Sequence, residues 1–237
     1  MNALLLAAGL GKRLLPITKL TPKCLVEING TPLLKIWLEK LSESEEIENI
    51  YINTHYFPEK VEEFIKNLND EIRGKIELIY EKELLGTAGT LQRVIRSANF
   101  NKPMLIAHAD NLSFFSLDCF IEAYRTRPDN CDITMMTFEA QNPQSCGIVK
   151  VNSDNIVTAF MEKPSRPAGN LANGAVYVAS PQGLREILGL SGATDISYDV
   201  LPKFICRINT WHNSIYHRDI GTPKSFNEAQ IDWKNFY

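Results

Sequence analysis

A turn rich in glycine and positive charge follows the first apolar segment of the chain. Its sequence is Leu6-Ala7-Ala8-Gly9-Leu10-Gly11-Lys12-Arg13, and its two glycines let the backbone approach a ligand and direct N–H groups at phosphate oxygens. Together with Lys19 and Lys23, the turn places four positive charges in the first 26 residues, which contain no acid. The segment predicts a polyphosphate site held by charge-assisted hydrogen bonds. An ordinary glycine turn with a solvated basic face is the alternative.

This turn matches neither of two common phosphate-binding fingerprints. A dinucleotide fingerprint requires a third glycine where Leu14 stands and an acid after the second strand, where Asn53 stands. A Walker loop requires Ser or Thr after Gly11-Lys12, and the residue there is Arg13. The sequence therefore argues against an NAD-binding Rossmann module.

Two further candidates are a lysine and an aspartate. Pro22 stiffens the chain just before Lys23, which suits a lysine that meets a phosphate, although a surface lysine is the simpler interpretation. Asp110 lies in Ala109-Asp110-Asn111, at the end of an apolar segment. Its carboxylate is suited to bind a magnesium ion that also contacts phosphates. A helix N-cap is the alternative for Asp110.

Two charged motifs lie in the second half of the chain. Glu162-Lys163-Pro164 ends a predicted strand, and an exposed ion pair is its simplest interpretation. Asp219 precedes Gly221-Thr222-Pro223 and suits either a second metal ligand or a residue that caps the helix after it.

The segments that must position these residues alternate between strands and helices. Strands are predicted at residues 2–8, 47–53, 75–80, 103–107 and 132–138, and helices at residues 32–41, 58–68, 88–97 and 117–125. This alternation indicates βαβ units and a parallel sheet, in which ligands bind at the carboxyl ends of the strands. The second half differs: it predicts a hairpin from 147–151 and 156–161, a strand at 171–178 and a terminal helix at 222–233.

The composition of the chain excludes several classes of binding partner and site. The 237 residues include 25 basic and 28 acidic ones, and the resulting net charge of −3 gives no drive towards nucleic acid or anionic membranes. No apolar run approaches the roughly 18 residues of a membrane helix. The five cysteines form no C-x-x-C pair, so neither a zinc site nor a disulfide framework is expected. We expect a cytoplasmic protein with no nucleic-acid or membrane partner. Homo-oligomerisation stays open, since nothing in the sequence marks an interface.

The order of these motifs is more specific than any one of them. The sequence resembles the sugar-1-phosphate nucleotidyltransferases, or nucleotide-sugar pyrophosphorylases, and its pattern is most like that of short mannose-1-phosphate guanylyltransferase-like enzymes. The resemblance runs from Asn2 to about Gln230. It is carried by the glycine turn, Thr21-Pro22-Lys23, Leu85-Gly86-Thr87-Ala88-Gly89, Asp110, Cys146-Gly147-Ile148-Val149, Glu162-Lys163-Pro164, Asn173-Gly174-Ala175-Val176-Tyr177 and Asp219-Ile220-Gly221-Thr222-Pro223. Cys146 departs from the tyrosine that is frequent in the family, and Ala109 from a glycine.

The resemblance implies a fold and a domain organisation. The fold is α/β, a Rossmann-like doubly wound mixed sheet with a smaller α+β sugar-binding lobe. Residues 1–237 form one nucleotidyltransferase domain, with a nucleotide-binding core over about 1–140 and a sugar-phosphate-binding part with the terminal helix over about 141–237.

The resemblance also implies roles for individual residues. The nucleoside triphosphate is bound by Leu6, Ala7, Ala8, Gly9, Gly11, Lys12, Arg13, Glu81, Gly86 and Thr87. The sugar phosphate is bound by Gly147, Glu162, Lys163 and Asn173, and Mg²⁺ by Asp110 and Asp219. The catalytic residues are Arg13, Lys23, Asp110 and Lys163.

The implied reaction joins a nucleoside triphosphate to a sugar-1-phosphate, with pyrophosphate as the leaving group. GTP is the favoured triphosphate, because the carboxylate of Glu81 suits the N–H donors of guanine, while UTP, CTP and dTTP stay open. A solvated strand end is the other interpretation of Glu81. The alternative functions are a cytidylyltransferase acting on CTP and phosphocholine or another non-sugar phosphate, and a non-catalytic regulatory subunit that binds nucleotide sugars.

Overall fold

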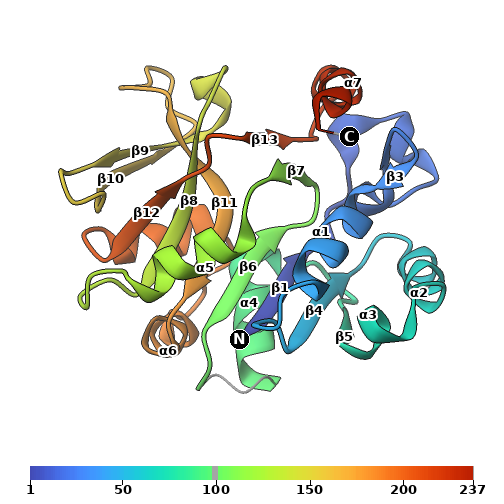
Figure 1. Cartoon of the computed structure of the whole chain (residues 1–237), viewed down its shortest axis with the longest axis horizontal. Coiled ribbons are helices and arrows are strands. Elements are labelled where there is room, and N and C mark those ends of the chain that lie inside the picture. Colours follow the sequence, from blue (N-terminus) through green and yellow to red (C-terminus); the bar gives the residue numbers. More distant parts are fainter. Residues whose placement is uncertain (98–100, 237) are drawn as a thin grey trace. The chain divides into compact units, whose positions relative to one another are not determined.

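The chain has a mixed α/β fold with a central mixed sheet, as expected (Figure 1). The computed structural model describes residues 1–97 and 101–236. It divides the chain into two compact units, each assembled from separate segments. Unit 1 contains Met1–Asn2, Leu85–Ala107 and Phe115–Ile215, and unit 2 contains Ala3–Leu84, His108–Phe114 and Tyr216–Tyr237.

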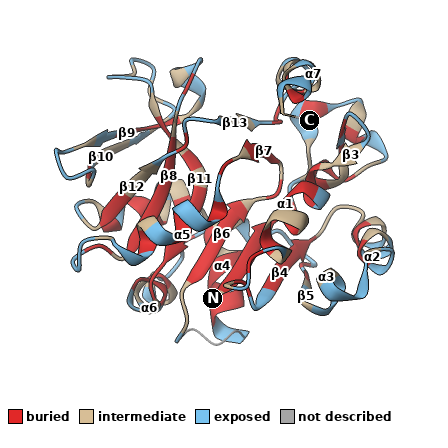
Figure 2. Cartoon of the chain, viewed as in Figure 1, coloured by how far each residue is buried: buried red, intermediate tan, exposed pale blue. Residues whose placement is uncertain are grey.

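Unit 2 is built on three strands and the helices that follow them. The strands are β1 (Asn2–Leu6), which lies in unit 2 from Ala3 onward, β4 (Asn49–Thr54) and β5 (Ile76–Tyr80), and the helices are α1 (Leu33–Ser42), α2 (Pro58–Lys66) and α3 (Asp70–Gly74). β4 and β5 are parallel, with Ile50 opposite Ile76. Figure 2 shows β1 and β4 buried along almost their whole length, which explains their apolar sequences.

Two small ribbons and the last helix complete unit 2. β2 (Glu27–Ile28) pairs with β3 (Thr31–Pro32), and β7 (Asn111–Phe114) pairs antiparallel with β13 (Tyr216–Asp219). Helix α7 (Pro223–Asp232) follows β13 directly and has Thr222 as its N-cap. The β7–β13 ribbon joins segments that are about a hundred residues apart in the sequence.

The described part of unit 1 is a largely antiparallel sheet with three α-helices. Its strands are β6 (Met104–His108, in this unit up to Ala107), β8 (Ile133–Glu139), β9 (Gly147–Val151), β10 (Val157–Glu162), β11 (Leu171–Ala179) and β12 (Ile208–His212). β11 runs antiparallel to β6, β8 and β9, whereas β12 runs parallel to β8. The helices are α4 (Gly86–Ser97), α5 (Leu117–Arg125) and α6 (Pro181–Gly189).

Most of the expected elements are present, and the differences are informative. Helix α5 has the expected bounds, and the expected hairpin forms as β9 and β10. The parallel pairing expected for strands of the first half is present between β4 and β5, and the antiparallel pairs of β11 in unit 1 agree with the expected mixed sheet. The strands β2, β3, β7, β12 and β13 and the helices α3 and α6 were not predicted from the sequence; β7, β12 and β13 are short strands paired with distant segments. No described helix combines the length and apolar character that a membrane crossing requires.

Candidate active site

Four charged residues that are distant in the sequence meet in unit 2. We call Arg13, Lys23, Asp110 and Asp219 the charged cluster. The Lys23 Nζ atom lies 2.5 Å from Asp110 Oδ2 and 3.2 Å from Asp219 Oδ1. The Arg13 guanidinium lies 3.8 Å from the other carboxylate oxygen of Asp219. These positions carry the predicted catalytic and metal-binding roles of this part of the chain.

Lys23 is the buried centre of the charged cluster. The residue is only 6% exposed, so the interpretation of Lys23 as a surface lysine is wrong. Burial lowers the pKa of its ammonium group, but Asp110 and Asp219 outweigh this effect and hold that pKa above its ordinary value. Burial conversely raises the pKa of the Asp110 carboxyl, while the charges of Lys23 and His108 hold it below its ordinary value. The ion pair is therefore charged over a wide pH range.

The β7–β13 ribbon places the two carboxylates together. Asp219, at the end of β13, is opposite Asn111 in the register of the ribbon, and Ile220 N–H donates to the carbonyl oxygen of Asp110 over 3.2 Å. Asp110 precedes a strand and Thr222 caps α7, so the N-cap interpretations of Asp110 and Asp219 are wrong. A pairing between two short strands thus brings two acids onto one lysine.

Two glycines leave room for these charges. A Cβ atom on Gly221 would lie 2.5 Å from Asp219 Oδ2 and 3.2 Å from the Arg13 guanidinium. Gly11 has a φ of +63°, and a Cβ there would lie 2.8 Å from Thr18. The Thr18 hydroxyl donates to the carbonyl oxygen of Gly11 over 2.8 Å, which secures the turn. At these positions a side chain would displace either the charged groups or the turn that precedes Arg13.

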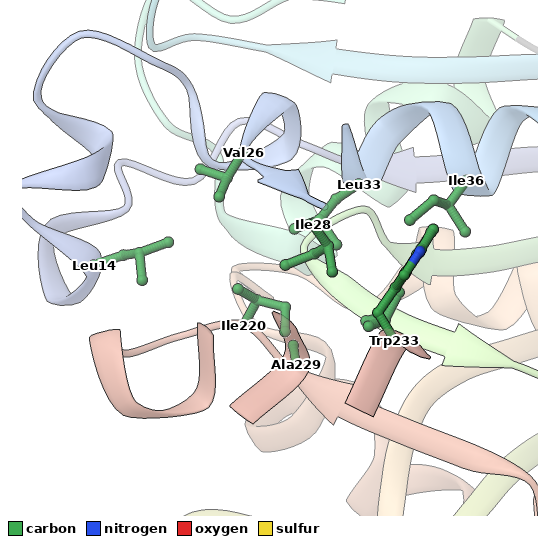
Figure 3. Packing of buried hydrophobic residues seen from close by; sticks show 9 residues of the cluster. Leu14, Val26, Ile28, Leu33, Ile36, Ile220, Ala229 and Trp233 are labelled. Atoms are coloured by element: carbon green, nitrogen blue, oxygen red, sulfur yellow. The ribbon is translucent and has the colours of Figure 1, made fainter. Parts of the chain in front are cut away.

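Unit 2 also contains a buried apolar cluster, some of whose members adjoin the charged residues in the sequence (Figure 3). Its buried members are Leu14, Val26, Ile28, Leu33, Ile36, Leu112, Ile220, Ala229 and Trp233. Leu14 and Ile220 directly follow Arg13 and Asp219, and Leu112 lies two residues after Asp110. Burial of these side chains, worth about 25 cal/mol per Å² of apolar surface, therefore holds the backbone segments from which the charges project.

The glycine turn is tied to the ends of neighbouring strands. Ala7 N–H donates to Asn53 Oδ1 over 2.7 Å, and Asn53 Nδ2 donates to Glu81 Oε1 over 3.0 Å. Glu81 is 1% exposed, so the interpretation of this residue as a solvated strand end is wrong. His55 Nδ1 lies 2.9 Å from the Glu81 carbonyl oxygen and is a structural hydrogen-bonding group. Of the predicted turn residues, Gly9, Lys12 and Arg13 are exposed, and a Cβ on Gly9 would meet nothing within 4 Å.

A second set of predicted residues lies on the sheet of unit 1. We call these residues, Gly147, Glu162, Lys163 and Asn173, together with Tyr177, which was not predicted, the strand cluster. Glu162 is opposite Gly147 in the β9–β10 register, and a Cβ on Gly147 would lie 2.7 Å from Glu162 Oε2. Lys163 N–H donates to the Cys146 carbonyl oxygen over 3.0 Å, and its Nζ lies 3.3 Å from Glu162 Oε1. The ion pair is asymmetric: the Lys163 side chain is 54% exposed and the Glu162 side chain 12%.

Asn173 shapes an irregular stretch of β11. Its Oδ1 accepts from Ala175 N–H over 2.9 Å, and its Nδ2 donates to the Tyr177 hydroxyl over 2.7 Å. Ala175 has a positive φ of 51°, and the pairing of β11 with β8 shifts between Asn173 and Tyr177. Burial raises the pKa of Tyr177, which stays a neutral hydroxyl. Tyr177 ends the motif Asn173-Gly174-Ala175-Val176-Tyr177 but had no predicted role; its position four residues after Asn173 is the signal in the sequence.

Gly86 and Thr87, the other predicted nucleotide contacts, pack against a turn that the sequence analysis did not single out. Gly86 has a φ of +75°, and a Cβ there would lie 2.2 Å from the Thr194 carbonyl oxygen. The Thr87 hydroxyl accepts from Ile196 N–H over 2.8 Å and lies 3.5 Å from Asp195 Oδ2. One oxygen of Asp199 accepts from the N–H groups of Thr194 and Asp195, and these hydrogen bonds hold the pKa of Asp199 below its ordinary value.

Comparisons with known proteins agree over nearly the whole chain. Residues 2–235 match the model of the family described as Nucleotidyl transferase. A mannose-1-phosphate guanyltransferase of Schizosaccharomyces pombe is 29% identical over 235 residues, which cover 95% of this chain and 62% of that protein. This chain thus spans less than two thirds of the length of that curated relative.

Two solved structures share the fold. A UDP-glucose pyrophosphorylase complexed with UDP-glucose has a TM-score of 0.81 and 20% identity, and the match covers 100% of this chain and 99% of that one. The protein HddC of Yersinia pseudotuberculosis complexed with GMP-PN has a TM-score of 0.78 and 22% identity, with 98% and 99% covered. At these identities the likeness establishes a common architecture.

Proposed function

Since the chain belongs to the nucleotidyl transferase family, we propose that it condenses a nucleoside triphosphate with a sugar-1-phosphate. The products are a nucleotide-diphosphate sugar and pyrophosphate. The charged cluster is the observation that carries this proposal, because it combines a buried lysine, an exposed arginine and two carboxylates in one place. Such a set suits a polyphosphate with a bound metal ion better than it suits a neutral ligand.

The reaction needs positive charge more than it needs a protein nucleophile. An oxygen of the sugar phosphate attacks the α-phosphorus of the triphosphate, and pyrophosphate leaves in line. Both reactants are anions, so catalysis consists mainly of positioning and charge neutralisation. Arg13 and Lys23 neutralise the triphosphate, and the exposed ammonium of Lys163 binds the sugar phosphate. Glu162 and Asn173 offer hydrogen-bonding groups to the sugar hydroxyls.

Asp110 and Asp219 are the residues that would hold Mg²⁺. Their carboxylates converge on one cation in the structure, the Lys23 ammonium, at 2.5 and 3.2 Å, so their oxygens fit a shared positive ion. No described residues form a group of three or more His, Cys, Asp or Glu side chains arranged for a metal. Two carboxylates suit Mg²⁺, which keeps several waters and binds substrate phosphates. Bound there, the ion would neutralise phosphate charge.

GTP is the proposed triphosphate, and mannose-1-phosphate is the first sugar phosphate to test. The name of the curated relative, a mannose-1-phosphate guanyltransferase, supports both choices. UDP-glucose in a protein of the same architecture keeps UTP as the principal alternative.

Pyrophosphate release with Mg²⁺ tests the proposal. GTP, UTP, CTP, dTTP and ATP are each combined with a panel of sugar-1-phosphates and with phosphocholine. We expect release that requires both GTP and one sugar phosphate, and its loss when EDTA removes the metal. Release with CTP and phosphocholine would replace the proposal by a cytidylyltransferase. Nucleotide-sugar binding without turnover would support a regulatory subunit.

A further inference from the structure

The peptide group between Leu6 and Ala7 is held from both sides within unit 2. The Leu6 carbonyl oxygen accepts from Ala109 N–H over 3.1 Å, and Ala7 N–H donates to Asn53 Oδ1 over 2.7 Å. Leu6 ends β1, Ala109 precedes Asp110, and Asn53 lies near the end of β4. One peptide plane is thus tied on one side to the Asp110 loop and on the other to a neighbouring strand, just where the glycine turn begins.

The orientation of the Asn53 amide is set by Glu81. Asn53 is 4% exposed and Glu81 is 1% exposed, and Asn53 Nδ2 donates to Glu81 Oε1 over 3.0 Å. A backbone N–H group can only donate and a carboxylate can only accept, so the amide oxygen must face Ala7 and the amide nitrogen must face Glu81. The Glu81 backbone is held in turn, since its N–H donates to the Thr54 carbonyl oxygen over 2.8 Å.

We propose that Asn53 and Glu81 are positioning residues that set the direction of the glycine turn relative to Asp110. The inference rests on the proposed function, because the glycine turn and Asp110 are its triphosphate and metal positions. It gives Glu81 a role through Asn53 in place of the direct contact with the base expected from the sequence. An asparagine is suited to this place because its amide offers an acceptor and a donor in opposite directions.

The first test measures the hydrogen bond without using activity. Hydrogen exchange of the Ala7 backbone N–H is followed by NMR in the wild-type protein and in Asn53→Ala. We expect faster exchange at Ala7 in the variant. The matched control is Asn209→Ala in unit 1: Asn209 is 6% exposed, its Oδ1 accepts from the Thr134 hydroxyl over 2.8 Å, and its Nδ2 donates to the Ala123 carbonyl oxygen. The control should destabilise the protein similarly and leave exchange at Ala7 slow.

The second test exchanges the polarity of the pair. Asn53→Asp keeps an acceptor for Ala7 N–H but places a second carboxylate against Glu81. Adding Glu81→Gln restores an amide–carboxylate pair with donor and acceptor reversed. We expect Asn53→Asp to lower kcat about tenfold, as loss of a buried hydrogen bond near a reacting group does, and the double variant to recover most of this loss. Glu81→Met, which removes the acceptor, should lose about tenfold more kcat than Glu81→Gln.

The outcomes separate this inference from its rival and from the proposed function. If Glu81→Gln alone shifts the preference away from GTP and does not rescue Asn53→Asp, Glu81 reads the base and the inference is overturned. Slow exchange at Ala7 in Asn53→Ala would overturn it as well. If the wild-type protein releases no pyrophosphate with any substrate, the proposed function fails, and the exchange experiment still decides whether the pair holds the turn. If Asn53→Asp does not fold, the kcat of Glu81→Met compared with that of Glu81→Gln decides whether the acceptor that Glu81 offers to Asn53 matters.

Discussion

The charged cluster of unit 2 and the strand cluster of unit 1 are assembled in different ways. The charged cluster takes its residues from four segments: the short helical turns at Lys12–Leu14 and Lys23–Leu25, the position just before β7 and the end of β13. The strand cluster takes its residues from neighbouring strands, where the register places Glu162 opposite Gly147 and a local shift follows Asn173.

The two clusters also differ in how their charges are balanced. Lys23 is buried between two acids, so each charge of the pair needs the other, and removing one partner leaves an uncompensated charge in a poorly hydrated place. Glu162 and Lys163 are sequence neighbours, and the lysine is largely solvated. We therefore expect substitutions in the charged cluster to affect turnover and folding together, and substitutions in the strand cluster to act mainly on substrate affinity.

The largest expected effect follows loss of a charge at the centre of the charged cluster. Lys23→Ala and Asp110→Ala should each lower kcat at least about 100-fold, as removal of a preorganised electrostatic group typically does. Steady-state pyrophosphate release measures this loss. The control is Lys35→Ala, whose half-exposed ammonium lies 3.6 Å from Glu39 and should matter little. Near-wild-type turnover in both cluster variants would remove the charged cluster from the mechanism.

A second prediction separates the clusters by substrate. Lys163→Ala should raise the KM for the sugar phosphate about tenfold or more, because one charge-assisted contact to its phosphate is lost, while the KM for the triphosphate changes little. The ratio of the two KM values is the measurement. An equal rise in both would assign Lys163 to a role shared by the two substrates and weaken the distinction between the clusters.

A glycine in or beside each cluster leaves room for its charged groups, and substitution by alanine tests whether that room is needed. In Gly221→Ala the new methyl group meets Asp219 Oδ2 at 2.5 Å, and in Gly147→Ala it meets Glu162 Oε2 at 2.7 Å. The Asp219 carboxylate can move, so we expect Gly221→Ala to lose up to about tenfold in kcat/KM with little change in Tm. In Gly147→Ala the methyl group also lies 2.8 Å from two ring atoms of Phe160, so we expect a similar loss in kcat/KM together with a lower Tm. Gly221→Ala should lower kcat/KM for the triphosphate, and Gly147→Ala should lower kcat/KM for the sugar phosphate. Gly189→Ala, whose Cβ would meet nothing within 4 Å, is the control.

The smallest effect concerns the turn against which Gly86 and Thr87 pack. Hydrogen bonds from Asp195 and Thr194 hold the pKa of Asp199 in the folded protein below its ordinary value. The Asp199 carboxylate therefore stabilises the fold fully above the unfolded pKa of about 3.9. This stabilisation is lost as the pH falls through the lower pKa of the folded state. Asp199→Asn should lower Tm by no more than about 3 °C near neutral pH, and this difference should shrink towards pH 3. Thermal melts across that range measure it; a difference that grows on acidification would contradict the assigned cause.

Much of the fold could be predicted from the sequence, because the spacing of apolar residues is a local pattern. Apolar runs marked β1 and β4, and helical spacing marked α1 and α5, since burial on one or both sides leaves a pattern within a few residues. β7, β12 and β13 were missed because polar residues interrupt each of them, as Asn209 does in β12 and Arg218 in β13, so no apolar run marks these strands.

The sequence by itself determined which residues could do the chemistry. The glycine turn, Lys23, the two aspartates and Glu162-Lys163 were identified from residue type and position, and Asn173 from the resemblance to the nucleotidyltransferases. Only the tertiary structure decided that Lys23 is buried between Asp110 and Asp219, that Thr222 rather than Asp219 caps α7, and that Glu81 holds Asn53. The physical reason is that composition and periodicity report on burial along one segment. A hydrogen bond or an ion pair depends on where two distant segments meet, and the pairing of β7 with β13 brings Asp219 to Asp110.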